Sequence, residues 1–290
     1  MMRIQVAGAR ATIQDRGRTG HARLGIPPSG PADPGAFAAA LELAGCASDD
    51  AAIEVVGLPF AFRCDDRRVV VATGRDVRLR TRARIPGWTS VLARPGEEVV
   101  VEGSASTRFA YVAVSGGIAL PRVLGSRATY LRATLGPMPR PLAAGDELPL
   151  GPSDVGVEAA GRRLAAPAYG GAIRAVAGPH DGRFPDGSLG RFFAASCTVL
   201  PESDRMGVRL GGVGLATPAG DLLTCGIVAG AVQVPRGGEP IVLLADHQTT
   251  GGYPIIATVV HADLGLVAQA APGEYLRFER VTAEEAHRSH

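Results

Sequence analysis

The chain has 290 residues, a formal net charge of +2 and a hydrophobic share of 46%. This length is enough for two domains of about 150 residues each, and the balanced charge excludes the basic surface typical of nucleic-acid-binding proteins. No uninterrupted run of about 18 apolar residues occurs, so we expect no membrane span and no membrane partner. The first residues, Met1–Val6, lack the long apolar segment of a signal peptide, and we expect a cytoplasmic location.

The sequence contains no lysine; apart from histidine, every basic residue is arginine. Schiff-base chemistry and a P-loop lysine are therefore impossible in this chain. Four cysteines lie far apart, without the spacing of a zinc site, and are expected to be reduced, small core residues. Among the four histidines outside the C-terminal tail, no pair has ligand spacing either, so we expect no metal site.

Short apolar runs broken by Gly, Pro and Asp recur along the chain, a pattern typical of a mostly-β sandwich or barrel. They predict strands at residues 68–73, 76–82, 97–102, 109–114, 173–177, 197–200, 231–234 and 274–278. Within Arg75–Arg84 arginines alternate with Val and Leu, which predicts one solvated and one buried face.

Few helices are expected. The clearest is Pro34–Ala44, with Asp33 as N-cap and Gly45 as its C-terminal stop. Shorter helices are predicted at residues 189–195, 262–269 and 283–287. The weakly patterned stretch Val155–Ala168 predicts a domain boundary. We therefore expect an N-terminal β domain over residues 1–160 and a C-terminal β-barrel domain over residues 168–290.

The stretch Asp246–Pro254 packs an acid, an imidazole, an amide, two hydroxyls and a phenol around a Gly-Gly pair. Apolar runs, Ile241–Ala245 and Ile255–Val260, flank it and predict strand, polar loop, strand. One interpretation is a functional loop on a rigid scaffold. The alternative is a hairpin whose Asp and Thr groups satisfy their own turn.

Other polar segments carry candidate chemistry. In the N-terminal segment, Arg18 can bind a carboxylate or phosphate, and Ser29 follows in the same region. The alternative for this segment is a long surface loop in which Asp15 pairs with a neighbouring arginine. Asp204 can act as an acid–base group or orient Arg205, or simply form an Asx turn.

Gln233 lies between two valines on a predicted strand. Because side chains alternate along a strand, its amide lies on the face opposite those valines. That amide either lines a site or faces solvent.

Several segments together resemble one known family. The matching motifs, in chain order, are Thr12–Gly20 with Gly25–Gly30, Tyr111–Ile118, Leu124–Tyr130, Ser203–Gly207 and Gln248–Tyr253. The family is the allophanate hydrolase subunit 2 or biotin-dependent carboxyltransferase family, which includes the C subunits of 5-oxoprolinases and the Kip inhibitor-antagonist proteins. The resemblance covers nearly the whole chain. It implies tandem cyclophilin-like β-barrel domains and a partner, a homologue of subunit 1, also called the B subunit.

The resemblance implies three alternative functions. The first is membership of an ATP-dependent 5-oxoprolinase, which opens 5-oxoproline to glutamate together with a B subunit and a third, A subunit. The second is a carboxyltransferase acting on urea-like substrates, with carboxybiotin on a separate carrier. The third is a non-catalytic regulator that antagonises its paired inhibitor subunit. Allophanate hydrolysis by a Ser-Ser-Lys triad is excluded, because the chain has no lysine.

We favour the first function, in which the complex uses ATP at a site that the sequence does not reveal. Opening a cyclic amide needs donors for a developing oxyanion and groups that move protons. The predicted catalytic residues are Asp246, Gln248, Thr249, Thr250 and Asp204. The predicted substrate-binding residues are Arg18, Asp15, Ser29, Arg205, Gln233 and Tyr253.

Overall fold

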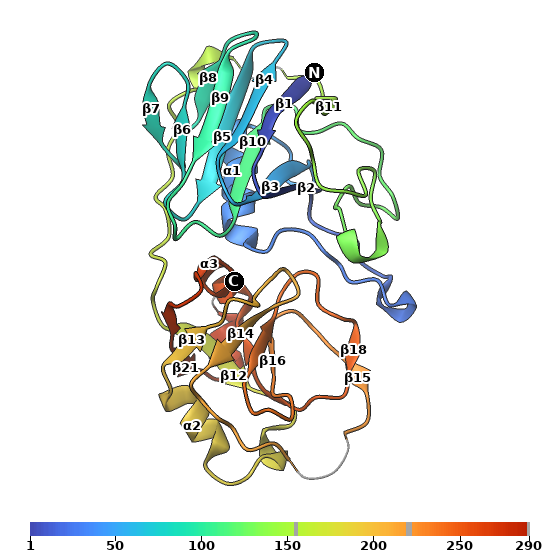
Figure 1. Ribbon diagram of the computed structural model, residues 1–290, viewed down its shortest axis with the longest axis vertical. Helices are drawn as coiled ribbons and strands as arrows, with labels where there is room; N and C mark the ends of the chain where they lie inside the picture. The colour runs from blue at the N-terminus through green and yellow to red at the C-terminus, as the bar shows by residue number, and fades with distance from the viewer. Residues whose placement is uncertain (154–155, 219–221, 289–290) are drawn as a thin grey trace. The chain divides into compact units, whose positions relative to one another are not determined.

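The computed structural model describes residues 1–153, 156–218 and 222–288 and is built mainly of β-strands (Figure 1). The mostly-β fold class with a few short helices is confirmed. The chain divides into two compact units: unit 1 is Met1–Arg18 with Ser29–Pro167, and unit 2 is Thr19–Pro28 with Ala168–His290. The division after Pro167 lies near the end of Val155–Ala168, the stretch expected to separate two domains. Val155 itself is outside the described residues. The segment Thr19–Pro28, expected in the N-terminal domain, groups with unit 2.

Unit 1 contains two antiparallel sheets. The first has the strand order β11-β1-β4-β9-β6-β7, and its strands are β1 (Met2–Ala7), β4 (Phe60–Cys64), β6 (Arg78–Arg80), β7 (Arg84–Pro86), β9 (Glu98–Glu102) and β11 (Glu147–Leu148). The second has the order β2-β3-β10-β5-β8, with β2 (Arg10–Gln14), β3 (Ala52–Val56), β5 (Arg68–Gly74), β8 (Val91–Ala93) and β10 (Ala110–Val114). One core of Ile, Val and Phe side chains draws on both sheets.

Helix α1 (Pro34–Ala44) packs on β5 and β10, and its predicted bounds are confirmed. The Asp33 carboxylate accepts a hydrogen bond from the backbone N of Ala36, and Gly45 takes the left-handed conformation that ends the helix. Phe37 meets Tyr111 of β10 edge-to-face, with ring centroids 6.0 Å apart. The helix therefore covers the apolar face of the second sheet.

The alternating run Arg75–Arg84 does not form the single strand expected over residues 76–82. Asp76 has a left-handed φ of 54°, which delays the strand until Arg78. The chain turns again at residues 81–83, and β7 pairs back antiparallel on β6. The predicted alternation itself is present: Leu79 is buried between the exposed Arg78 and the half-buried Arg80.

Unit 2 is built on an eight-stranded sheet of order β20-β13-β14-β17-β16-β19-β12-β21. Its strands are β12 (Ile173–Ala177), β13 (Cys197–Val199), β14 (Gly207–Gly211), β16 (Ala231–Gln233), β17 (Ile241–Leu243), β19 (Ile255–Val259), β20 (Tyr275–Leu276) and β21 (Phe278–Arg280). Only Arg277 separates β20 from β21, the two strands at opposite edges of the sheet. The sheet must therefore curl until its edges nearly meet, which makes it a nearly closed barrel. Its cyclophilin-like character stays a prediction.

The short helices of unit 2 lie close to their predicted positions: α2 (Ser188–Ala194), α3 (Leu264–Gln269) and α4 (Ala283–His287). Phe192 of α2 stacks on Phe278 of β21, with centroids 4.8 Å apart. Asp263, before α3, binds both the backbone N and the guanidinium of Arg174 in β12. These contacts attach the helices to the barrel.

The polar stretch Asp246–Pro254, hereafter the Asp246 loop, joins β17 to β19. These two strands do not pair, because β16 lies between them in the sheet. Residues Thr250–Gly251 instead form β18, which pairs with β15 (Cys225–Gly226) (Figure 1). The hairpin interpretation of this stretch is therefore wrong, and a second polypeptide segment supports the loop.

Candidate functional site

In unit 1, Asp15 organises a buried polar cluster. It is 4% exposed, and its carboxylate accepts hydrogen bonds from the backbone N of Gly17 at 2.9 Å, from Ser126 Oγ at 2.5 Å and from the backbone N of Arg127 at 2.5 Å. The alternative pairing of Asp15 with a neighbouring arginine side chain is therefore wrong, whereas most of residues 19–25 in the same segment are exposed at the surface. The carboxylate joins the first motif of the chain to the motif Leu124–Tyr130.

Arg18 and Ser29 lie in the same region of unit 1. Arg18 is 1% exposed, and its guanidinium donates to the carbonyl oxygen of Ala128. Ser29 is buried with a left-handed φ of 56°, and its Oγ has no hydrogen-bond partner within the described residues. A Cβ on the adjacent Gly30 would lie 3.1 Å from the carbonyl oxygen of Asp15. The fold thus brings Asp15, Arg18 and Ser29 together around residues 126–128.

Sequence reasoning missed Glu54, which supports this region from β3. Its Oε2 accepts from the backbone N of Ala32 and from the hydroxyl of Tyr111, both at 2.9 Å. The Tyr111 hydroxyl in turn accepts from the backbone N of Asp33 at 2.7 Å. A carboxylate inside the apolar run Ala51–Val56 was the available signal, because a buried Glu is rare unless it is paired.

In unit 2, Arg205 and Asp246 form a buried bidentate ion pair. Arg205 Nε lies 2.8 Å from Asp246 Oδ2, and Nη2 lies 3.1 Å from Oδ1, with both side chains less than 10% exposed. The backbone N of Asp246 also donates to the carbonyl oxygen of Arg205 at 2.9 Å. The pair fixes the start of the Asp246 loop against the turn before β14. Both carboxylate oxygens face the guanidinium, so Asp246 is placed to hold structure more than to move a proton.

Two glutamines form an amide pair beneath the same loop. Gln248 Nε2 donates to Gln233 Oε1 at 2.9 Å, and Gln233 is 1% exposed. Gln233 therefore faces inward to the loop, not to solvent. Its Nε2 has no hydrogen-bond partner within the described residues.

Gly251 closes this arrangement. A Cβ at this position would lie 3.1 Å from Gln233 Nε2 and 2.6 Å from Cδ1 of Ile227. Only a residue without a side chain leaves the backbone this close to the amide pair. The unsatisfied amide of Gln233 therefore lies directly beneath the Gly251 backbone.

His247 is buried within the loop and 4% exposed. Its Nδ1 lies 2.6 Å from the carbonyl oxygen of Gln248, so in the neutral ring Nδ1 carries the proton. Burial lowers the pKa of His247 below its ordinary value, although the neighbouring carbonyl and Asp246 act in the opposite direction. The imidazole is therefore held neutral at pH 7.

The remaining predicted residues differ in exposure. Thr249 is buried and its carbonyl oxygen accepts from the backbone N of Ile227, whereas Thr250 is exposed on β18. Asp204 is exposed, and its Oδ1 accepts from the backbone N of Met206 at 2.8 Å, which is an Asx turn. In this turn the Asp204 side chain is therefore exposed, whereas that of the next residue, Arg205, is buried.

Tyr253 lines a hollow of about 280 Å³ in unit 2, hereafter the arginine hollow. Its lining residues are Arg183, Thr217, Pro218, Leu222, Val234, Arg236, Gly252, Tyr253 and Pro254. The turn η4 (Asp181–Arg183) is joined to the loop by His180, whose Nδ1 accepts from the backbone N of Ile255 at 3.1 Å. The backbone N of Val234 donates to the carbonyl oxygen of Pro254 at 2.9 Å. Hydrogen bonds therefore attach the η4 turn and Val234 to the segment Pro254–Ile255 beside the hollow.

We expect unit 2 to lose stability as the pH falls below 6.5, the ordinary pKa of histidine. His180 accepts through Nδ1, so it must be neutral; burial, with a smaller effect of Arg183, lowers its pKa from the ordinary 6.5. As the pH falls, His180 takes up a proton in the unfolded chain before it does so in the folded chain. Its contribution to stability is therefore complete above pH 6.5, and it is lost as the pH falls from 6.5 towards the lowered pKa of the folded state. Urea unfolding at several pH values measures this loss.

The control is His180→Asn, whose side-chain oxygen accepts the same bond but does not titrate. The slope of unfolding free energy against pH should be shallower in this variant than in the wild type. His247 adds a slope of the same sign in both proteins, so only the difference between them reports on His180. Identical slopes would contradict the assignment.

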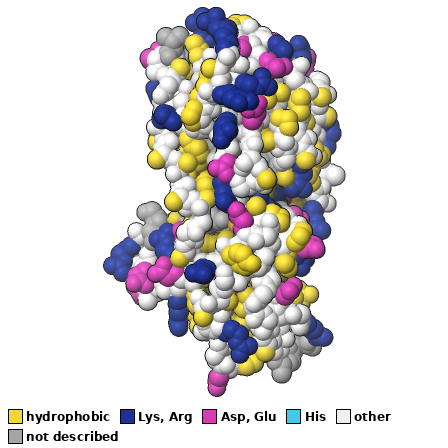
Figure 2. Space-filling view, turned by 60° about the vertical axis from the view of Figure 1, so that its left-hand side comes forward, with side chains coloured by type: hydrophobic (Ala, Val, Ile, Leu, Met, Phe, Trp, Pro, Cys, Tyr) yellow, Lys and Arg dark blue, Asp and Glu magenta, His cyan; other side chains and the backbone are white. Residues whose placement is uncertain are grey.

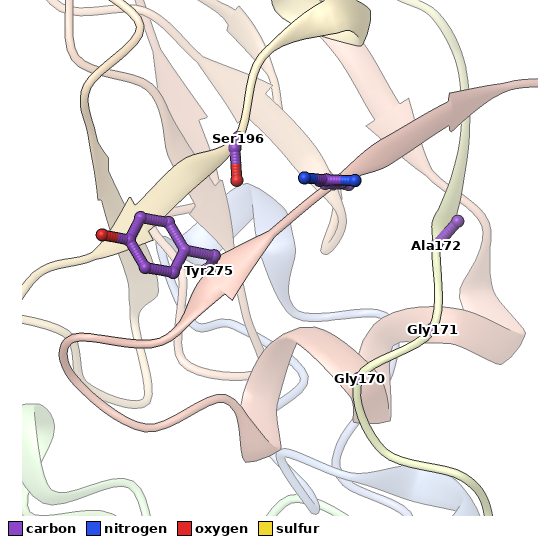
Figure 3. Close-up of a pocket in the computed structure, with 6 residues that line it drawn as sticks. Gly170, Gly171, Ala172, Ser196 and Tyr275 are labelled. Atoms are coloured by element: carbon purple, nitrogen blue, oxygen red, sulfur yellow. The ribbon is translucent and has the colours of Figure 1, made fainter.

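Two further hollows contain none of the predicted site residues. One, of about 660 Å³ in unit 2, is lined by Gly170, Gly171, Ala172, Ser196, Tyr275 and Arg277. Figure 3 shows Ser196 and Tyr275 on neighbouring segments, with the glycine backbone opposite. The other, of about 480 Å³ in unit 1, lies beside Trp88 and Leu164. The candidate chemistry is therefore concentrated in the Asp15 cluster and around the Asp246 loop.

The surface agrees with the balanced charge of the sequence. Figure 2 shows arginines interspersed with acidic side chains on the visible face. In the described part of the chain, no group of three or more His, Cys, Asp or Glu is placed to hold a metal ion. Nor does any helix there have the length and apolarity needed to cross a membrane.

Comparison with known proteins identifies relatives across nearly the whole chain. The chain is 36% identical to the C subunit of 5-oxoprolinase from Escherichia coli over 99% of its own length and 93% of the relative's. It is 30% identical to urea amidolyase of Saccharomyces cerevisiae, of which it covers 17%. The crystal structure of TTHA0988 superposes with a TM-score of 0.86 at 29% identity; the match covers 96% of this chain and 55% of that one.

The family model for the carboxyltransferase domain, subdomain A and B, matches residues 24–280. This range includes the Asp246 loop and most of the motifs noted in the sequence. The chain therefore belongs to the carboxyltransferase domain family, subdomains A and B.

Proposed function

We propose that this chain is the C subunit of a heteromeric, ATP-dependent 5-oxoprolinase, which opens 5-oxoproline to glutamate. The observation that carries this proposal is the 36% identity to the C subunit of the Escherichia coli 5-oxoprolinase over 93% of that relative's length. Urea amidolyase, by contrast, matches through 17% of its length. As part of this hydrolase, the chain acts in the cytoplasm on a small cyclic amide.

The Asp246 loop supplies groups suited to this chemistry. Hydrolysis of a lactam develops negative charge on the carbonyl oxygen, which hydrogen-bond donors held in place stabilise. Gln248 and the backbone amides of Gly251 and Gly252 are the proposed donors, with the hydroxyls of Thr249 and Thr250 beside them. The Arg205–Asp246 pair holds this loop rigid, so the donors need no reorganisation during the reaction.

In unit 1, the Asp15 cluster is a second set of proposed substrate-binding residues. Asp15 fixes the loop that carries Arg18, and the buried hydroxyl of Ser29 lies in the same cluster. A guanidinium and a hydroxyl suit a carboxylate or a phosphorylated group.

The described residues do not form the usual phosphate-binding elements of an ATP site, a P-loop lysine or an open helix N-terminus. The chain has no lysine, and α1 is the one helix in the described part that exceeds seven residues. The Asp33 carboxylate occupies its N-terminus, where a phosphate would otherwise bind. ATP hydrolysis supplies the driving force for ring opening in the complex, and we assign its site to a partner protein.

The lengths of two similar proteins support the need for partner subunits. This chain covers 55% of TTHA0988 and 17% of urea amidolyase, so in both proteins it corresponds to one part of a longer polypeptide. We propose that a separately encoded homologue of subunit 1 (the B subunit), with a third, A subunit, takes the place of such fused parts.

Co-expression with candidate A and B subunits, followed by an assay of glutamate release from 5-oxoproline, tests the proposal. We expect ATP-dependent release from the purified complex and none from this chain alone. Activity of the isolated chain would contradict its assignment to a heteromeric enzyme. A tight complex without turnover would favour the regulatory alternative.

The family match favours a second candidate, carboxyl transfer to a urea-like substrate with carboxybiotin on a separate carrier. This function predicts that removal of biotinylated proteins with avidin abolishes the reconstituted activity. The 5-oxoprolinase function predicts no effect of avidin. Avidin treatment therefore distinguishes the carboxyltransferase function from the 5-oxoprolinase function.

We expect Gln233→Leu to raise the unfolding free energy while lowering turnover. The buried, unsatisfied amide of Gln233 costs about 1–3 kcal/mol in the native state, and leucine removes it without leaving a large cavity. The same change deprives Gln248 of its partner and frees the proposed donor from its fixed position. Urea unfolding of the chain and the glutamate-release assay on the complex measure the two effects.

The matched control is Val232→Leu, a change to the same side chain at the neighbouring position of β16, where no glutamine is removed. It should lose stability through overpacking, by about 1–3 kcal/mol. If Gln233→Leu instead destabilised the chain and kept full turnover, the amide pair would be structural and the proposed role wrong.

A further inference from the structure

We propose that Gln14 and Ser29 of unit 1 form a polar subsite that accepts the ring N–H of the substrate and thereby selects a cyclic amide such as 5-oxoproline. This inference rests on the proposed function and names a specificity-determining residue, Gln14, that sequence reasoning did not single out. Gln14 is 0% exposed and Ser29 is 7% exposed. Within the described residues, Gln14 Oε1 and Ser29 Oγ both lack a hydrogen-bond partner.

The side-chain amide of Gln14 is held in one orientation. Its Nε2 donates to Thr12 Oγ1 at 3.0 Å and to the carbonyl oxygen of Thr129 at 3.2 Å. Because a carbonyl oxygen can only accept, rotating the amide by 180° would place two acceptors against each other. The atom without a partner is therefore the acceptor Oε1. A buried acceptor lowers stability unless a donor meets it, so this position suits a ligand with an N–H group.

Gln14 belongs to a row of polar side chains on one face of the second sheet of unit 1. Strand pairing places Thr12 opposite Glu54 and Glu54 opposite Tyr111, and directly opposite residues share a face. Gln14 lies two positions after Thr12 on β2, so it faces the same way. Ile13, between them, belongs to the apolar core. The polar row is therefore buried on the side of the sheet away from that core.

The segment Ser29–Asp33 covers this polar row. As described above, two backbone N–H groups of the segment donate to the Glu54 carboxylate and the Tyr111 hydroxyl. At the other end of the segment, a Cβ on Gly30 would lie 3.1 Å from the carbonyl oxygen of Asp15, directly after β2. The segment thus extends over the row from the end of β2 to β10.

The covering position is unfavourable for Ser29. Its φ of 56° is left-handed, a conformation that residues other than glycine adopt rarely, and its hydroxyl is buried without a partner in the described part of the chain. Backbone strain of this kind is typical of ligand-binding segments. Since Gln14 is fully buried, the segment opens to admit a substrate and closes over it. A substrate that bonds to both side chains offsets the cost of closing.

A lactam carries the groups that these two side chains lack. Its ring N–H can donate to Gln14 Oε1, and its carbonyl oxygen can accept from the Ser29 hydroxyl. In 5-oxoproline the carboxylate is attached to the carbon next to the ring nitrogen. Arg18, which we propose binds an anionic group, donates to the carbonyl oxygen of Ala128, and Gln14 donates to that of Thr129. The guanidinium and the acceptor thus meet neighbouring residues, as a lactam with an adjacent carboxylate requires.

The first test compares the binding of two ligands to the full-length chain by ligand-observed NMR. One is 5-oxoproline, and the other is 3-oxocyclopentane-1-carboxylate, in which a ring methylene replaces the N–H. We expect 5-oxoproline to bind about tenfold more tightly or better, because the methylene leaves Gln14 Oε1 buried without a donor. In Gln14→Met, which removes the acceptor from a side chain of similar shape, this preference should fall to about twofold or less.

The matched control is Thr12→Val, which removes one partner of Gln14 Nε2 but leaves Oε1 and the bond to Thr129 in place. This variant should keep the preference for 5-oxoproline, and urea unfolding checks that both variants fold. Failure of the wild-type chain to bind 5-oxoproline, equal binding of the two ligands, or an unchanged preference in Gln14→Met would overturn the proposal.

Ser29→Ala provides a second variant that does not depend on the folding of Gln14→Met. The hydroxyl has no partner among the described residues, so its removal should leave the stability of the chain unchanged. Because both ligands carry the ring carbonyl, we expect this variant to weaken the binding of both by about threefold or more and to keep the preference for 5-oxoproline. Unchanged affinity for both ligands would contradict the role of Ser29.

The second test uses the reconstituted complex, where the KM for 5-oxoproline should rise in Gln14→Met far more than kcat falls. An active complex with an unchanged KM would reject the subsite and leave the proposed function intact. Preferential binding of 5-oxoproline that is lost in Gln14→Met, with no ATP-dependent glutamate release from any complex, would retain the subsite and reject the function. The two proposals can therefore fail separately.

Discussion

Asp246→Ala is expected to lower the unfolding free energy by about 3–5 kcal/mol and to abolish turnover in the complex. The Asp246 carboxylate is 6% exposed and meets Arg205, 5% exposed, through two hydrogen bonds. Alanine removes the counter-charge and leaves a guanidinium buried without it, which costs far more than the loss of a surface ion pair. Calorimetric or urea unfolding of the isolated chain measures the effect.

The double variant Arg205→Met/Asp246→Leu distinguishes stability from function. Replacing a buried ion pair by apolar side chains of similar volume is often neutral or stabilising, so the double variant should recover most of the lost stability. If the pair holds the Asp246 loop for catalysis, turnover should stay low even though the fold has recovered. Recovery of turnover together with stability would show that the pair only stabilises unit 2.

The exposed neighbour provides a matched control. Asp204→Ala removes a surface Asx turn one residue before Arg205, and we expect a loss of no more than about 1 kcal/mol. A loss from Asp246→Ala as small as that from Asp204→Ala would contradict the importance of the buried pair.

Asp15→Ala is expected to destabilise unit 1 by roughly 3 kcal/mol, because three donors lose one shared acceptor. The backbone N of Gly17, Ser126 Oγ and the backbone N of Arg127 all donate to this carboxylate. Their loss frees the loop that leads to Arg18. Trp88 is the single tryptophan of the chain and belongs to unit 1, so its fluorescence during urea unfolding reports on this unit.

Ser126→Ala is the matched control for Asp15→Ala. It removes the hydroxyl that donates to Asp15 and accepts from the backbone N of Ala128 at 2.9 Å, but it leaves the two backbone bonds to Asp15. We expect Ser126→Ala to lower the unfolding free energy by about 1 kcal/mol. Equal losses in the two variants would mean that the hydroxyl, and not the carboxylate, holds the two motifs together.

Local patterns predicted the regular elements well. The helix α1 was defined by Asp33, Pro34 and Gly45, which act within one or two turns of the chain. The strand Ile173–Ala177 was predicted with its bounds, because its apolar run ends at a glycine. The run Arg75–Arg84 was misjudged as one strand, because the left-handed Asp76 and the turn at 81–83 leave no distinctive local pattern.

The sequence indicated candidate site residues but not the hydrogen bonds between them. Asp246, Gln248 and Gln233 were named from residue chemistry, yet nothing local shows that Gln248 bonds to a side chain fifteen positions earlier. Likewise, Asp246 was named as a catalytic residue that holds or moves a proton, and nothing local shows that the fold places Arg205 against both of its oxygens. Arg183 and Arg236 were not singled out, because no local sequence pattern marks either of them. Only the fold of unit 2 places both in the lining of one hollow.

The sequence by itself determined the mostly-β class, the family and the loops that carry polar chemistry, because strand periodicity, caps and motifs are properties of neighbouring residues. Only the tertiary structure decided which polar groups are buried, which of them pair and which line a hollow. The insertion of β16 between β17 and β19 decided that the Asp246 loop is not a hairpin. Strand order, burial and side-chain pairing depend on contacts between segments far apart in the chain, and no local pattern encodes them.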